Sequence, residues 1–135
     1  MEYTLEGKRV SMLNFLAVAI GGALGAVARY GTGIWISAKW VHAFPLHTFL
    51  INITGSFLLG LLNTLFLDRL ILNPEMRLAL TVGFLGAFTT FSTLSHETIM
   101  LIKDGNICTA LLYTVASVFI SLFGVFAGLS LARFI

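Results

Sequence analysis

The sequence predicts an all-α membrane protein with four transmembrane helices. Of its 135 residues, 58% are hydrophobic and only 10% are charged. A soluble domain carries roughly 25% charged residues, so this composition is typical of a chain that lies mostly in lipid. A transmembrane helix needs about 20 apolar residues to cross roughly 30 Å of hydrocarbon. The chain is therefore long enough for four such helices and leaves little room for a soluble catalytic domain.

The first predicted helix covers about residues 12–37, after a polar N-terminal tail of residues 1–11. Residues 12–135 then form a single four-helix transmembrane domain. The first apolar run is longer than the core of a secretory signal and has no clear cleavage context, so we expect it to be retained. Arg29 is its exceptional residue, because an arginine in mid-membrane costs about 2.5 kcal/mol or more unless it snorkels or faces water. It either reaches one interface or places a positive charge in an aqueous vestibule that attracts anions.

The second predicted helix covers about residues 46–67 and carries a polar stripe. Four polar residues share one of its faces by helical spacing: Thr48, Asn52, Ser56 and Asn63. Such a stripe in an apolar span indicates either a functional site or a set of interhelical hydrogen bonds, each worth about 1 kcal/mol or less. His42 and His47 fall near the bilayer surface in the preceding connection, where we expect both to be solvated.

The third predicted helix covers about residues 75–103 and contains the stretch GFLGAFTTFSTLSHET, residues 83–98. Glycine weakens a helix, and the side-chain hydroxyls compete for backbone hydrogen bonds, so we expect the helix to be broken within residues 83–93. Unwound backbone in a membrane persists only where protein or ions satisfy it. Carbonyls such as those of Gly86 and Thr89 are therefore candidates to bind a hard monovalent cation. A cation that needs more carbonyls than one chain offers favours a two-fold dimer.

The fourth predicted helix covers about residues 107–134 and carries a second polar stripe. Three of its residues stand at i, i+4 and i+8: Tyr113, Ser117 and Ser121. Phe88 and Phe91 add positive ring edges next to the break. With the amide of Asn52, these groups form a track of weak donors without a fixed charge. Such a track suits a small, strongly hydrated anion, so the residues alone predict a small-ion pathway.

Basic residues predict the orientation only weakly. The side that carries both termini has five of them: Lys8, Arg9, Arg69, Arg77 and Arg133. The opposite side has Lys39 and Lys103, joined by Arg29 if that side chain reaches the interface. The positive-inside rule thus leans toward cytoplasmic termini, with a bias small enough for insertion in both orientations.

Three blocks of the sequence resemble the Fluc (CrcB-type) fluoride channels in order and spacing: GGALGAVARYG, HTFLINITGSFLLG and GFLGAFTTFSTLSHET. The similarity extends over about residues 14–134. The resemblance implies a fluoride-selective channel that exports fluoride passively from the cytoplasm and so reduces its toxicity. It also implies a multi-pass protein of the cell membrane, an antiparallel dual-topology homodimer with two pores, and a structural sodium ion at the dimer interface.

The same resemblance assigns residues to the fluoride pathway. These are Asn52 as the pore asparagine, Phe91 as the first phenylalanine of a pair, Arg29 of the first helix, the polar track of Tyr113, Ser117 and Ser121, and two further polar positions, Thr48 and Glu97. The carbonyls of Gly86 and Thr89 match sodium-binding positions. Leu94 departs from the family, since a second phenylalanine is usual there. Its aliphatic side chain has no positive ring edge, so we expect this part of the pathway to be altered.

Two other functions remain as alternatives. A small multidrug-resistance-type transporter also has four spans, but its proton coupling needs a carboxylate in the first helix, which this chain lacks. Glu97 is the only acid inside a predicted span, and its ordinary interpretation is an interhelical or interfacial hydrogen bond. A structural subunit would explain the glycines but would leave Asn52, Ser117 and Ser121 without a purpose.

The sequence contains no motif typical of an enzyme or of a nucleic-acid-binding protein. It has no nucleophile paired with a base, no metal-ligand cluster and no glycine-rich phosphate loop. Cys108 is the only cysteine, so no intrachain disulfide forms. The net charge is only +2 and no run of basic residues is present, so the sequence does not indicate a nucleic-acid-binding surface.

Overall fold

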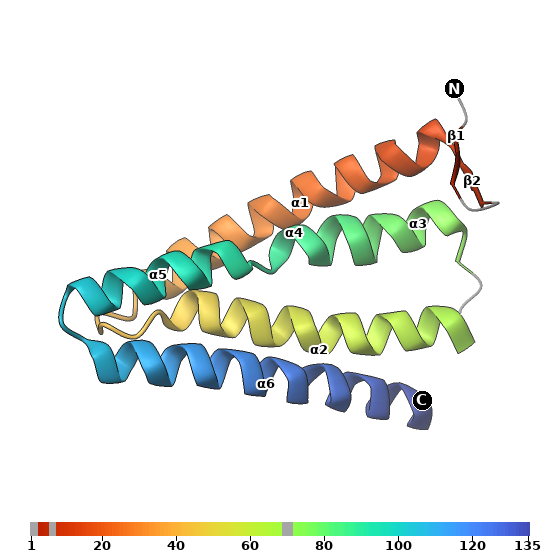
Figure 1. Ribbon diagram of the computed structural model, residues 1–135. Helices are drawn as coiled ribbons and strands as arrows, with labels where there is room; N and C mark the ends of the chain where they lie inside the picture. The colour runs from red at the N-terminus through yellow and green to blue at the C-terminus, as the bar shows by residue number, and fades with distance from the viewer. Residues whose placement is uncertain (1–2, 6–7, 69–71) are drawn as a thin grey trace.

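The computed structural model describes residues 3–5, 8–68 and 72–135. Within these residues four long helical segments run back and forth and pack into one bundle (Figure 1). They are α1 (Met12–Ser37), α2 (Leu46–Asp68), a third span from Pro74 to Lys103, and α6 (Ile107–Phe134), and all four are long and apolar enough to cross a membrane. The protein is a multi-pass, all-helical membrane protein, which confirms the predicted architecture.

Two short strands lie in the predicted polar tail. Strand β1 (Tyr3–Leu5) pairs antiparallel with β2 (Lys8–Val10), with Tyr3 opposite Val10. The pairing lies at the start of α1, at the end of the bundle that also holds the C-terminus (Figure 1). This pairing was not predicted, because three residues per strand are too few for a recognisable alternation of polar and apolar residues. Arg69, which entered the orientation argument, lies outside the described residues.

The third span is interrupted near its middle, as predicted (Figure 1). It begins as α3 (Pro74–Leu78), continues as the π-helical η1 (Ala79–Leu85) and the single turn α4 (Gly86–Phe88), and resumes as α5 (Phe91–Lys103). Thr89 and Thr90 between them are extended, with ψ angles of 159° and 121°. The predicted range of the break, residues 83–93, is therefore too wide, since residues 83–88 are helical.

Close helix packing explains why the glycines do not unwind the chain. A Cβ atom on Gly21 of α1 would collide with the Ala79 carbonyl of η1, and one on Gly83 would come within 2.8 Å of the Val18 carbonyl oxygen. Helices α2 and α6 meet in the same way, because a Cβ atom on Gly128 would collide with the Phe57 backbone. These glycines let helix backbones approach each other, as small residues do in membranes.

The most buried apolar cluster lies between α5 and α6. It consists of Leu94, Leu101, Ala110 and Tyr113, with Phe44 and Phe49 packed against it. The outer faces of the helices are also apolar, and large side chains such as Phe119 and Phe123 are exposed. A soluble protein with such a surface would aggregate, whereas lipid is its natural solvent.

Candidate functional site

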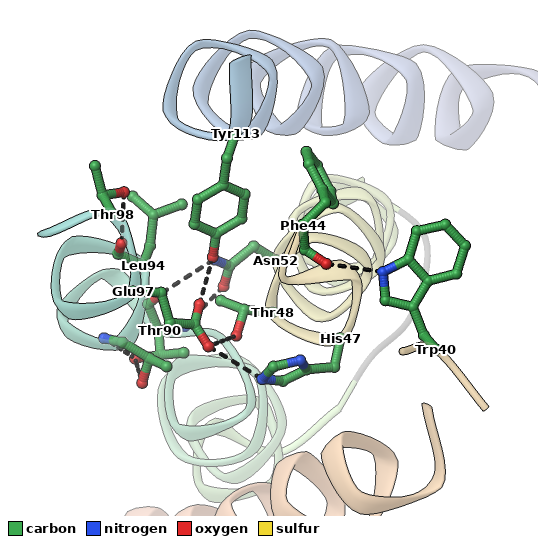
Figure 2. A network of polar contacts seen from close by, with 11 residues as sticks. Trp40, Phe44, His47, Thr48, Asn52, Thr90, Leu94, Glu97, Thr98 and Tyr113 are labelled. Atoms are coloured by element: carbon green, nitrogen blue, oxygen red, sulfur yellow. Dashed lines mark hydrogen bonds and ion pairs between the residues drawn. The ribbon is translucent and has the colours of Figure 1, made fainter. Parts of the chain in front are cut away.

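Glu97 stands at the centre of a hydrogen-bonded network that joins α2, α5 and α6 (Figure 2). Its Oε1 accepts a hydrogen bond from Thr48 Oγ1 at 3.0 Å, and its Oε2 accepts one from Tyr113 Oη at 2.6 Å. Thr48 and Tyr113 are only 1% and 0% exposed. Burying these polar groups is costly unless they are hydrogen-bonded, and here each finds the same carboxylate. The ordinary interpretation of Glu97 as an interhelical hydrogen-bonding residue is confirmed.

His47 also belongs to this network, which corrects its predicted solvated role. Its Nε2 lies 3.1 Å from Oε1 of Glu97, and its side chain is only 32% exposed. Helix α2 begins at Leu46, so His47 stands in the first turn beside Thr48 rather than in the connection. The position of His47 next to Thr48 on the helix was the only sequence feature that could have indicated this contact, since the sequence of one helix does not show which residues of another helix it contacts. His42 is exposed, as expected, with its ring centroid 4.5 Å from that of Trp40.

Asn52 holds the break in the third span. Its Nδ2 donates to the Thr90 carbonyl at 3.0 Å, and its Oδ1 accepts from Thr90 N at 2.8 Å (Figure 2). One side-chain amide thus satisfies both backbone groups of a residue that has left the helix. Thr90 also caps α5, because its Oγ1 accepts from Thr93 N at 3.2 Å. Thr90 was not among the predicted site residues, although a threonine just before a helical run is a recognised N-cap signal.

A cavity of about 330 Å³ opens between α2, the break and α6. Its walls comprise Asn52, Ser56, Gly86, Thr89, Thr90, Phe91, Leu94, Ser117, Val118 and Ser121. Seven of the predicted site residues therefore meet in one place. The Oγ atoms of Ser117 and Ser121 are buried and have no hydrogen-bond partner within the described part of the chain. Unpaired buried hydroxyls are costly, so they indicate a place for a small polar ligand.

The aromatic residues near the break differ in their surroundings. Phe91 is 76% exposed and lies at the rim of this cavity, whereas Leu94 is 4% exposed and belongs to the apolar cluster. Phe88 is not among the residues that line the cavity. Its ring stacks on that of Phe84, with centroids 6.0 Å apart and planes 7° apart. Phe88 thus packs against Phe84, and its contribution of a ring edge to the ion track stays a prediction.

A second cavity, of about 370 Å³, lies on the α1 side of the break. Arg29 lines it together with His47, Thr48, Thr90 and Thr93. The Arg29 guanidinium Nη1 is 3.5 Å from the Thr89 carbonyl oxygen, so the side chain is directed to the break. Thr90 lines both cavities and lies between them.

The predicted pathway residues thus form two groups. Asn52, Ser117 and Ser121 line the first cavity with uncharged donors, while Tyr113 joins Thr48 at the Glu97 carboxylate. Tyr113 stands one turn before Ser117 on α6 but does not line this cavity, and its hydroxyl instead binds Glu97. No group of three or more His, Cys, Asp or Glu side chains in the described ranges has the arrangement of a metal site. The wall of the first cavity therefore offers an amide and two hydroxyls as uncharged hydrogen-bond donors.

Comparison with known proteins gives a consistent result. Residues 16–129 match the family described as CrcB-like protein, Camphor Resistance (CrcB). Among its relatives, proteins from Rhizobium meliloti and Geobacter sulfurreducens are each 45% identical over 90% of this chain and 98% of their own length. One from Thermus thermophilus is 47% identical over 85% of this chain and 90% of its own. All three bear the name fluoride-specific ion channel FluC. The chain belongs to the CrcB/FluC family, a family of ion channels and not of enzymes.

Proposed function

We propose that this protein is a fluoride-specific ion channel of the cell membrane that lets fluoride leave the cytoplasm passively and so reduces its toxicity. The observation that carries the proposal is the pair of unpartnered hydroxyls, Ser117 and Ser121, on the wall of the first cavity. Fluoride is small and strongly hydrated, so it crosses only where donors replace its water. Neutral donors in series bind it weakly enough for it to leave again.

Each pathway residue has a physical task in this proposal. Arg29 raises the local fluoride concentration at its cavity through its positive charge. Asn52 uses one N–H to hold Thr90 and directs its amide into the first cavity, where the second N–H serves the ion. The edge of the Phe91 ring, at the rim, meets the anion with its positive side. Leu94 supplies an apolar wall that binds nothing and keeps the passage narrow.

An antiparallel homodimer would complete the first cavity. Phe91 at its rim is largely exposed, and Gly86 is exposed too, so the cavity is open on the side of the break. A second copy packed there covers both residues and encloses the pathway. The two-fold axis then produces two pathways, and the small charge bias of the sequence permits both orientations in the membrane.

A structural sodium ion at the dimer interface fits the carbonyls of the break. Thr90 N donates to Asn52, so the Gly86 carbonyl does not receive the partner that a continuous helix would supply. Among the described residues, the Thr89 carbonyl accepts only the long 3.5 Å contact from Arg29. Two such carbonyls from each copy present the oxygen donors that sodium takes from unwound helices. The ion would then fix the two breaks against each other.

Fluoride efflux from liposomes tests the proposed function. Purified protein is reconstituted with internal potassium fluoride, valinomycin is added, and release is followed with a fluoride electrode, with potassium chloride in a parallel sample. We expect rapid fluoride release without a proton gradient and no chloride release. A multidrug-type transporter would need a proton gradient and an accessible carboxylate, whereas Glu97 is held by its neighbours. No release of fluoride from folded protein would contradict the proposal.

A further inference from the structure

His47 occupies a position that the pathway residues described so far do not explain. Its imidazole lines the Arg29 cavity and also a third cavity, of about 230 Å³, whose walls include Trp40, His42 and Glu97. Figure 2 shows the ring at the start of α2, directed at the Glu97 carboxylate. The residue therefore lies between the Arg29 cavity and the end of the bundle where α1 and α2 are connected.

We propose that His47 is a positioning residue whose protonation sets the rate of fluoride passage, by offsetting the negative charge of Glu97 at the mouth of the pathway. This inference rests on the proposed channel function and adds pH regulation to it.

The charges around Glu97 give the direction of the effect. Thr48 and Tyr113 donate hydrogen bonds to the carboxylate but bring no positive charge. With a neutral imidazole the network therefore carries one negative charge, which repels an incoming anion. A protonated imidazole, with Nε2 3.1 Å from Oε1, offsets that negative charge. An anion in the pathway then meets a pair of groups with no net charge. A neutral imidazole still carries one N–H and is able to donate it to Glu97, so the contact does not require a charged ring.

Other ionisable groups lie near His47. Helix α1 packs close to the imidazole, since a Cβ atom on Gly33 would lie 3.8 Å from its Cδ2. From α1, Arg29 and Tyr30 line the same cavity, and an arginine stays positive throughout. His42 lines the third cavity but is exposed, so solvent screens its charge. Imidazole is the side chain that can change its charge between about pH 5 and 8, and His47 is the imidazole in contact with the Glu97 carboxylate.

The experiment measures fluoride efflux from liposomes with equal pH on both sides, at steps from about pH 8 to about pH 5.5. The leak of hydrogen fluoride through protein-free liposomes is subtracted at each pH. We expect wild-type efflux to rise roughly three- to tenfold as the pH falls. His47→Gln keeps an N–H donor without the charge and should stay at the low rate at every pH. His47→Lys carries a fixed charge and should stay at the high rate. His42→Gln, a matched control, should keep the wild-type profile.

Other outcomes overturn the inference. Fluoride efflux of the wild-type protein that does not change with pH would overturn it. The same pH dependence in wild type and in both His47 variants would overturn it too. Loss of efflux in both variants, with the dimer intact by gel filtration, would also contradict it, because conduction must occur beside either charge state. If wild-type protein releases no fluoride at any pH, the proposed function itself fails and the inference loses its basis.

Discussion

Ser117 and Ser121 face one cavity from successive turns of α6, and their hydroxyls differ from others on the same helix. Thr114 donates to the Ala110 carbonyl one turn earlier, at 2.9 Å, which is how a hydroxyl in a membrane helix usually finds a partner. Ser117 and Ser121 make no such bond, although their Oγ atoms are buried. Hydroxyls that only packed helices together would not remain unpaired beside a cavity.

Removal of these hydroxyls separates a packing role from an ion-binding role. In the double variant Ser117→Ala/Ser121→Ala we expect fluoride efflux to fall by roughly tenfold or more, since one lost hydrogen bond to a charged group is worth about 1.5–3 kcal/mol. Thermal stability in detergent should stay equal or rise, because no existing bond is lost. Ser130→Ala, on α6 but outside the cavity, should leave efflux unchanged. Reduced stability with normal efflux would contradict the assignment.

Asn52 combines a structural task with a functional one, so its substitution affects both. Asn52→Ala leaves the N–H and C=O of Thr90 without partners, and we expect a loss of about 1–3 kcal/mol in the free energy of unfolding. We also expect fluoride efflux to stop, because the break loses its fixed position. Asn63→Ala on the same helix, outside the cavity, is the control. Stability is measured by differential scanning calorimetry in detergent, and fluoride efflux is measured in liposomes. Equal stability and equal efflux in the two variants would refute the double role of Asn52.

At the scale of elements, the small residues of the third span serve helix packing and its hydroxyl residues form the break. Its glycine-bearing first half packs closely on α1, while the hydroxyl pair Thr89–Thr90 forms the break. Thr90 then caps α5, so the helix resumes directly at Phe91. The break is short because it is held at both ends, by packing before it and by Asn52 and the cap after it.

Close packing of α1 on η1 is testable with one pair of glycine variants. Gly21→Ala puts a methyl group against the Ala79 carbonyl, and we expect it to lower the free energy of unfolding by roughly 1–3 kcal/mol. Gly31→Ala on the same helix meets nothing within 4 Å, so its stability should be equal or slightly higher. Thermal unfolding of both variants in detergent gives the comparison. A similar loss in both variants would contradict the packing account, because a methyl group at Gly31 meets no neighbouring atom.

The sequence predicts the helices well because each apolar run is bounded by polar residues, as at Ser11 and Lys39. It also predicts that the third span breaks, since hydroxyls cluster there. It places the break too broadly, because whether a glycine unwinds a helix or packs against a neighbour depends on the other helix. Two contacts of Glu97, with His47 and with the Tyr113 hydroxyl, were missed for the same reason: both depend on how helices are rotated against each other.

At the scale of the whole molecule, a single chain leaves its break and one side of its cavity uncovered. The exposed Phe91 and Gly86 lie beside the carbonyls proposed to bind sodium, so the proposed dimer and the proposed ion site would share one surface. We expect replacement of sodium by N-methyl-D-glucamine, at matched ionic strength, to lower the thermal stability of the dimer and to abolish fluoride efflux. Return of sodium should restore both. Unchanged stability and efflux after complete removal would contradict a structural sodium ion.

The most direct test of a passive fluoride-selective pathway is the reversal potential in a planar bilayer. Purified protein is recorded with a fluoride gradient across the bilayer and an opposing chloride gradient. The proposed pathway of neutral donors predicts a current that reverses at the equilibrium potential of fluoride, whatever the chloride gradient. A reversal near the chloride potential, or the absence of any fluoride current from dimeric protein in sodium, would contradict it.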